Sequence, residues 1–200
     1  KTLRTDINNS SRHIDPAELK RAQELGVEFL EVPIALDGIA IVTHRSNNFC
    51  DNLSVAELKK IWEPGSTVKN WNQVRNTFPD MELKLYGPGT DSGTFDYFTH
   101  AIVGREKASR ADYMGSENDN MLIHGVAGDE GSLGYFGFAY YESHKDKLKL
   151  IGVESKPGVA VFPSNQTIGD GSYSPLSRPL FVYVNKEAMD RSEVTDFVMY

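Results

Sequence analysis

The 200-residue sequence has one cysteine, few basic residues and no long apolar run. The single cysteine, Cys50, excludes an intramolecular disulfide and a cysteine-based zinc site, and we expect it to be a small, partly buried packing residue. No apolar run reaches the roughly 18 residues that suggest a membrane-spanning helix. These absences leave a globular protein of one domain or two small lobes.

Basic charge is also scarce. Lysine and arginine number 21 against 28 acidic residues, which gives a net charge of −7 and a pI near 5.2. This balance argues against nucleic acid as a partner, because nucleic-acid binding needs a basic face. It leaves room for a small anion, provided that the site uses aimed dipoles in place of bulk positive charge.

The sequence gives no metal site or cofactor motif. None of the five histidines forms a His-x-x-x-His pair or another metal-ligand spacing. Residues 117–120 group two acids with two asparagines, but they lack the twelve-residue calcium-loop pattern. We therefore expect this group to cap a helix and assign the protein no cofactor.

A small-residue loop at residues 87–94, called loop 87–94 below, is the centre of the sequence. Residues 82–86 before it alternate as in a strand, and Gly104 after it is suited to end a helix. Between them, apolar residues recur at helical spacing: Phe95, Phe98, Ala101 and Ile102. The pattern predicts that the loop leaves a strand and opens a helix.

Such a turn can hold an anion. The first N–H groups of a helix have no internal partner, and the helix dipole adds partial positive charge there. Gly93 allows a ligand close to the main chain, and Ser92 and Thr94 add hydroxyl donors. The pattern indicates an anion cradle built of neutral donors.

A plain structural interpretation is also open, in which Asp91 or Ser92 merely caps the helix. The loop is not a Walker P-loop, because no Gly-Lys-Ser/Thr follows. It is not a Gly-x-Ser-x-Gly nucleophile elbow either, since Asp91 stands directly before Ser92.

Residues 87–98, GPGTDSGTFDYF, resemble the anion-binding loop of the substrate-binding proteins of ABC-type phosphate importers, most closely their cyanobacterial branch. Further segments resemble the same branch in the same order along nearly the whole chain: residues 6–12, 116–120, 125–129, 133–137, 139–141 and 173–181. The breadth of the likeness makes it more specific than any single motif.

The resemblance implies an α/β fold of the type II periplasmic-binding-protein class, with two lobes joined by two crossover strands. Residues 1–43 and 178–200 would form part of the first lobe, and residues 44–177 the second lobe with loop 87–94. The family's usual first strand, Ser/Thr-rich loop and helix have no match here, so the first lobe is expected to be incomplete and the chain a fragment. Closure would hinge near residues 43–46 and 177–180.

The resemblance also implies a function: binding of inorganic phosphate in the cleft between lobes and delivery to the transmembrane permease of an ABC importer. The expected protein is a monomer and no enzyme. It would be periplasmic or extracellular, with a membrane anchor in a missing N-terminal segment as one possibility.

The expected phosphate ligands are Ser92, Gly93 and Thr94, with Ser11 and Arg12 from the other lobe. From the residues alone, Arg12 reads as a surface arginine paired with a carboxylate; the resemblance favours a ligand role.

Two positions depart from the better-known relatives. Where those proteins carry an aspartate that accepts a proton from phosphate and an arginine, this chain has Ser11 and Pro88. The ligand shell must therefore differ in detail. Asp91 either orients Arg12 or accepts a proton from the ligand, and the first role is favoured because an unpaired carboxylate beside a dianion costs free energy.

Two other functions stay open. One is a binding protein for another oxyanion, such as sulfate or molybdate. The other is a hydrolase or phosphotransferase that uses Ser92 with Asp91, although no histidine base for Ser92 is evident in the sequence.

Elsewhere the sequence predicts ordinary structural elements. Capping boxes begin helices at Asp15 and Ser54, and residues 39–42 form a buried strand. Trp62 and Trp71 are predicted to pack in the core. Residues 180–184 should be a central strand and residues 187–200 a helix, and Leu3 and Ile7 are expected to point inward.

Overall fold

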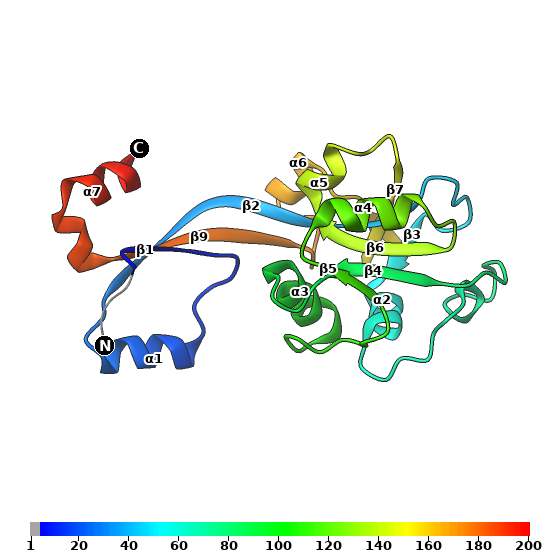
Figure 1. Cartoon of the computed structure of the whole chain (residues 1–200), viewed down its shortest axis with the longest axis horizontal. Helices are drawn as coiled ribbons and strands as arrows, with labels where there is room; N and C mark the ends of the chain where they lie inside the picture. Colours follow the sequence, from blue (N-terminus) through cyan, green and yellow to red (C-terminus); the bar gives the residue numbers. More distant parts are fainter. Residues whose placement is uncertain (1–4) are drawn as a thin grey trace. The chain divides into compact units, whose positions relative to one another are not determined.

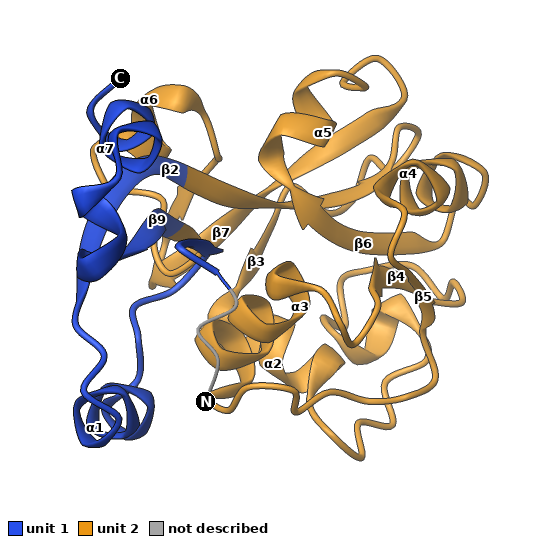
Figure 2. Cartoon of the chain, turned by 60° about the vertical axis from the view of Figure 1, so that its left-hand side comes forward, with its two compact units in different colours: residues 1–36, 178–200 blue, residues 37–177 orange. Residues whose placement is uncertain are grey.

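A computed structural model describes residues 5–200, so the expectation for Leu3 lies outside the described residues. The chain forms two compact units: Lys1–Leu36 with Arg178–Tyr200 is unit 1, and Asp37–Ser177 is unit 2 (Figure 2). The chain passes between them twice, within strand β2 (Phe29–His44) and at the start of strand β9 (Ser177–Asn185).

Helices and strands alternate along the described chain, as expected for an α/β fold (Figure 1). The remaining strands are β1 (Ile7–Ser10), β3 (Asn52–Ser54), β4 (Lys84–Pro88), β5 (Met114–Ser116), β6 (Ser132–Gly137), β7 (Leu148–Lys156) and β8 (Val159–Val161). The α-helices are α1 (Pro16–Glu24), α2 (Val55–Trp62), α3 (Gly93–Phe98), α4 (Asp119–Ala127), α5 (Phe138–Glu142), α6 (Asn165–Gly169) and α7 (Ser192–Met199). Short helical turns are η1 (Trp71–Gln73), η2 (Thr99–Val103) and η3 (Lys186–Asp190).

The sheet of unit 2 mixes parallel and antiparallel pairs. Strand β4 lies parallel to both β5 and β6, with Tyr86 opposite Met114 and Gly134. The second half of β2 pairs antiparallel with β6 and β7. Because β4, β5 and β6 run in one direction, their carboxyl ends lie at the same edge of the sheet, where α/β proteins place ligands.

Local sequence signals account for the helix starts. Asp15 accepts a hydrogen bond from the Glu18 amide and Glu18 reaches back to Asp15, so the predicted capping box is confirmed. The same reciprocal pair joins Ser54 and Glu57 at the start of α2. Each box satisfies backbone donors that the helix itself leaves unpaired.

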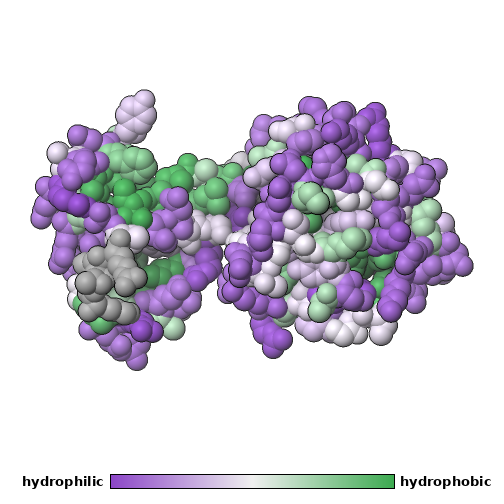
Figure 3. All heavy atoms as spheres, viewed as in Figure 1, coloured by the Kyte–Doolittle hydropathy of each residue, from purple (hydrophilic) through white to green (hydrophobic). Residues whose placement is uncertain are grey.

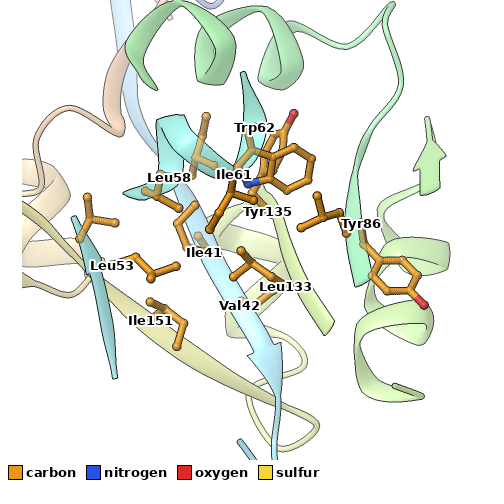
Figure 4. Packing of buried hydrophobic residues seen from close by; sticks show 14 of the residues in the cluster. Ile41, Val42, Leu53, Leu58, Ile61, Trp62, Tyr86, Leu133, Tyr135 and Ile151 are labelled. Atoms are coloured by element: carbon orange, nitrogen blue, oxygen red, sulfur yellow. The ribbon is translucent and has the colours of Figure 1, made fainter. Parts of the chain in front are cut away.

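Unit 2 holds the large hydrophobic core (Figure 4). The predicted buried strand is confirmed, since residues 39–42 are inaccessible to solvent or nearly so. Trp62 meets Tyr135 edge to face, with ring centroids 4.9 Å apart, and both rings are buried among aliphatic side chains. Trp71 is also buried, so both tryptophans pack in the core as predicted.

Unit 1 has a smaller core. Strand β1 pairs antiparallel with β9, and the buried cluster contains Val182, Val184, Ala188 and Val194. Helix α1 buries no side chain. Apolar surface gathers on this unit, where Ile34 and Phe197 are exposed (Figure 3).

Two predictions need correction. The helix predicted over residues 187–200 is divided into η3 and α7, because Arg191 adopts an extended conformation between them. The chain leaves unit 1 at Leu36–Asp37, earlier than residue 43, because residues 39–44 already pair with β6 or β7. The assignment of lobes by sequence stays a prediction.

No helix within residues 5–200 is both long and apolar enough to cross a bilayer.

Candidate functional site

Loop 87–94 joins the carboxyl end of β4 to helix α3, as the sequence predicts. The helical path continues from α3 through η2 and stops at Gly104, whose φ of 93° is left-handed. Phe95 and Phe98 are buried and anchor the helix against unit 2. The loop therefore stands at the sheet edge where β4, β5 and β6 all end.

Ser92 is the N-cap of α3. Its Oγ accepts a hydrogen bond from the Thr94 amide at 3.2 Å, which confirms one of the two caps that the sequence allowed. A hydroxyl that accepts one hydrogen bond keeps its proton for a second partner. Capping is therefore compatible with donation from Ser92 to a bound oxyanion.

The loop is open at its tip. Asp91 and Gly93 are exposed, and Ser92 and Thr94 are half-buried. Within the turn the Ser92 amide donates to the Gly89 carbonyl at 3.1 Å, and the Asp96 amide donates to the Ser92 carbonyl at 3.1 Å. These bonds fix the shape of the turn while leaving its tip accessible to solvent.

Residues 113–117, around β5, contact the loop at three points. The Tyr113 hydroxyl donates to the Pro88 carbonyl at 2.9 Å, and the Gly89 amide donates to the Ser116 carbonyl at 3.2 Å. The Asp91 amide donates to Oε1 of Glu117 at 3.3 Å. Sequence reasoning missed these contacts, because no local signal shows that β5 pairs with β4.

A cavity of about 460 Å³ lies beside the loop within unit 2. Gly89 and Thr90 line it together with Lys107, Ser109 and Glu117. The Lys107 ammonium lies 3.8 Å from the Asp96 carboxylate, so its charge is partly offset. The space next to the loop is therefore polar, with one cation and one carboxylate on its wall.

Ser11 and Arg12 belong to unit 1 and are described within it. The Arg12 guanidinium donates to both carboxylate oxygens of Glu18, at 2.9 and 3.0 Å, and also to the His13 carbonyl. These hydrogen bonds lower the pKa of Glu18. Arg12 thus makes the carboxylate pair that the residues alone indicated, while its pairing with Asp91 stays a prediction.

No arrangement for nucleophilic catalysis surrounds Ser92. Within residues 5–200, no hydrogen bond joins Ser92 to a histidine. His13 pairs with Glu31, and His44 pairs with Ser46. The same part of the chain has no group of three or more histidine, cysteine, aspartate or glutamate residues that could hold a metal ion.

The fold and the loop define a class: an α/β binding protein with a neutral-donor turn at the carboxyl edge of its sheet. A family model described as the PBP superfamily domain matches residues 2–200. The chain belongs to the PBP superfamily.

Relatives extend this result. The chain is 50% identical over 198 residues to Protein SphX from Synechocystis, an alignment that covers 98% of this chain and 59% of that protein. Among solved structures, it is similar to a possible phosphate binding protein from Planctomyces limnophilus, with 41% identity, a TM-score of 0.82, and coverage of 97% of this chain and 69% of that one.

A putative phosphate ABC transporter substrate-binding protein with bound phosphate, from Clostridium perfringens, is 25% identical with a TM-score of 0.72, over 97% of this chain and 71% of that one. The chain spans only about 59% of the length of the first relative named above.

Proposed function

We propose that the protein binds inorganic phosphate through loop 87–94 and delivers it to the transmembrane permease of an ABC-type importer. Ser92, Gly93 and Thr94 donate to the phosphate oxygens, and Ser11 and Arg12 complete the shell from unit 1. The protein works outside the cytoplasmic membrane, in a periplasmic or extracellular compartment. It is a binding protein and not an enzyme.

One observation carries the proposal: an exposed, glycine-containing turn opens helix α3 at the edge where three parallel strands end. Main-chain amides and hydroxyls there supply donors to a tetrahedral oxyanion without any need for a basic surface. This agrees with a net charge of −7, which would repel an anion from any site lacking aimed dipoles.

The relatives support the choice of phosphate. The structures named above are described as phosphate-binding proteins, and one of them holds phosphate. The absence of a histidine partner for Ser92 among residues 5–200 favours binding over hydrolysis.

Calorimetry on the protein at its full natural length tests the proposal. We expect Ser92→Ala to weaken phosphate binding about tenfold, because it removes one hydrogen bond to a charged ligand. The substitution also removes a helix cap and costs about 1 kcal/mol of stability. Ser54→Ala is the matched control, since it removes the cap of α2 at the same cost and should leave phosphate affinity unchanged.

Unchanged affinity in Ser92→Ala contradicts the assignment. Competition with sulfate separates phosphate from other oxyanions, and release of phosphate from a chromogenic ester by the unaltered protein would reveal the hydrolase alternative.

A further inference from the structure

The short strand β5 and the residues beside it hold loop 87–94 from one side. Tyr113, Ser116 and Glu117 receive or donate hydrogen bonds at three successive points of the loop: the Pro88 carbonyl, the Gly89 amide and the Asp91 amide. Two of these contacts would survive most substitutions or lie on buried strand edges. The third depends on one carboxylate, Glu117, at the point where the loop turns toward its donors.

Gly89 makes room for that carboxylate. A Cβ atom at position 89 would lie 1.9 Å from Oε1 of Glu117, far inside van der Waals contact. The φ angle of Gly89 is not in the left-handed region, so the backbone itself would accept a side chain there. The close approach of Glu117 to the main chain is therefore what a side chain at position 89 would disrupt.

The loop has a reason to need such support. It contains Gly87, Gly89 and Gly93, and glycine loses more conformational freedom on ordering than any other residue. A flexible loop must be ordered when it binds, and that cost lowers affinity. A hydrogen bond from the Asp91 amide to a charged acceptor is stronger than one to a neutral group, and it holds the residue directly before Ser92.

We propose that Glu117 is a positioning residue for the loop: it fixes the Asp91 amide so that Ser92, Gly93 and Thr94 are arranged for an oxyanion before the ligand arrives. The inference rests on the proposed function, since it assigns Glu117 a part in the same site. Glu117 does not touch the ligand in this account. Its negative charge opposes an incoming anion, and the gain from a preformed loop outweighs that repulsion.

Phosphate calorimetry on three single variants tests this role. Glu117→Ala removes the acceptor and is expected to weaken phosphate binding about three- to tenfold. Glu117→Gln keeps an oxygen at the same place and should stay within about twofold of the unaltered protein. Glu130→Ala is the control for lost charge, because Glu130 is exposed and precedes the first residues of β6, which pair with the opposite end of β4 from the loop; it should leave affinity unchanged.

A double-mutant cycle with Gly89→Ala sharpens the test. The new methyl group should displace Glu117 and weaken binding about as much as Glu117→Ala, and the two changes together should cost little more than either alone. Tighter phosphate binding in Glu117→Ala would overturn the proposal and show that the carboxylate competes with the ligand. Additive losses in the cycle would overturn it as well.

Amide hydrogen exchange separates failure of this inference from failure of the proposed function. An unaltered protein that does not bind phosphate refutes the function. In that event the positioning role is still measured by exchange at the Asp91 amide, which should quicken in Glu117→Ala and in Gly89→Ala but not in Glu117→Gln. Equal exchange in all four proteins would sink it.

Discussion

The guanidinium of Arg110 is almost fully buried, and its partners explain how unit 2 tolerates it. It donates to both oxygens of Asp112, at 2.6 and 2.8 Å, and to the carbonyls of Ile61 and Val68. A buried charge is stable only when it is paired and hydrogen-bonded in this way. These hydrogen bonds from Arg110 lower the pKa of Asp112 from 3.8 to about 2.

This pair predicts a pH-dependent stability. Because the pKa of Asp112 is lower in the folded chain, its contribution is fully present above about pH 4 and is lost as the pH falls through about 2. Asp112→Asn should therefore be less stable than the unaltered protein at pH 7, and the difference should shrink between pH 4 and pH 2. Urea unfolding at several pH values measures it.

Asp146→Asn, an exposed carboxylate in the same unit, is the control and should show no such convergence. A stability difference for Asp112→Asn that stays constant down to pH 2 would contradict this account of the pair.

Among elements, the helical path of α3 and η2 depends on how it ends. Gly104 has a φ of 93° and closes the path with hydrogen bonds from its amide to the carbonyls of Thr99 and His100. Left-handed backbone is unfavourable for residues with a Cβ atom by about 1–2 kcal/mol. Gly104→Ala is therefore expected to destabilise unit 2 by about 1 kcal/mol.

Gly169 provides a matched control. A Cβ atom at either glycine would meet no atom within 4 Å, but Gly169 lies outside the left-handed region. Gly169→Ala should be neutral or stabilising by about 0.5 kcal/mol, through the unfolded chain. Thermal unfolding of the two variants tests the comparison, and equal destabilisation would show that φ is not the cause.

The elements that the sequence predicted correctly are those with local signals. Asp15, Ser54, Ser92 and Gly104 each act on backbone groups within four residues, so their roles can be read from spacing. The contacts of Glu117 with Gly89 and Asp91 could not, because they depend on the pairing of β4 with β5 across 28 residues, as between Tyr86 and Met114. The break at Arg191 was also missed, since no proline or glycine marks it.

At the scale of the whole molecule, the two units differ in how much core they bury. Unit 2 contains the extended cluster that includes Trp62, Trp71 and Tyr135, whereas unit 1 buries a few residues on β9, η3 and α7. The proposed donors from loop 87–94 therefore stand on the better-packed unit. A rigid support of this kind favours a preformed anion site, because less ordering remains to be done on binding.

The central claim is that an acidic protein holds phosphate with main-chain amides and hydroxyls at the start of α3. A crystal structure of the full-length protein with phosphate tests it most directly. The account predicts a tetrahedral anion with oxygens about 2.7–3.1 Å from the Ser92 hydroxyl and the amides of Gly93 and Thr94. Phosphate bound elsewhere, with those three donors still bonded only to protein, would contradict it.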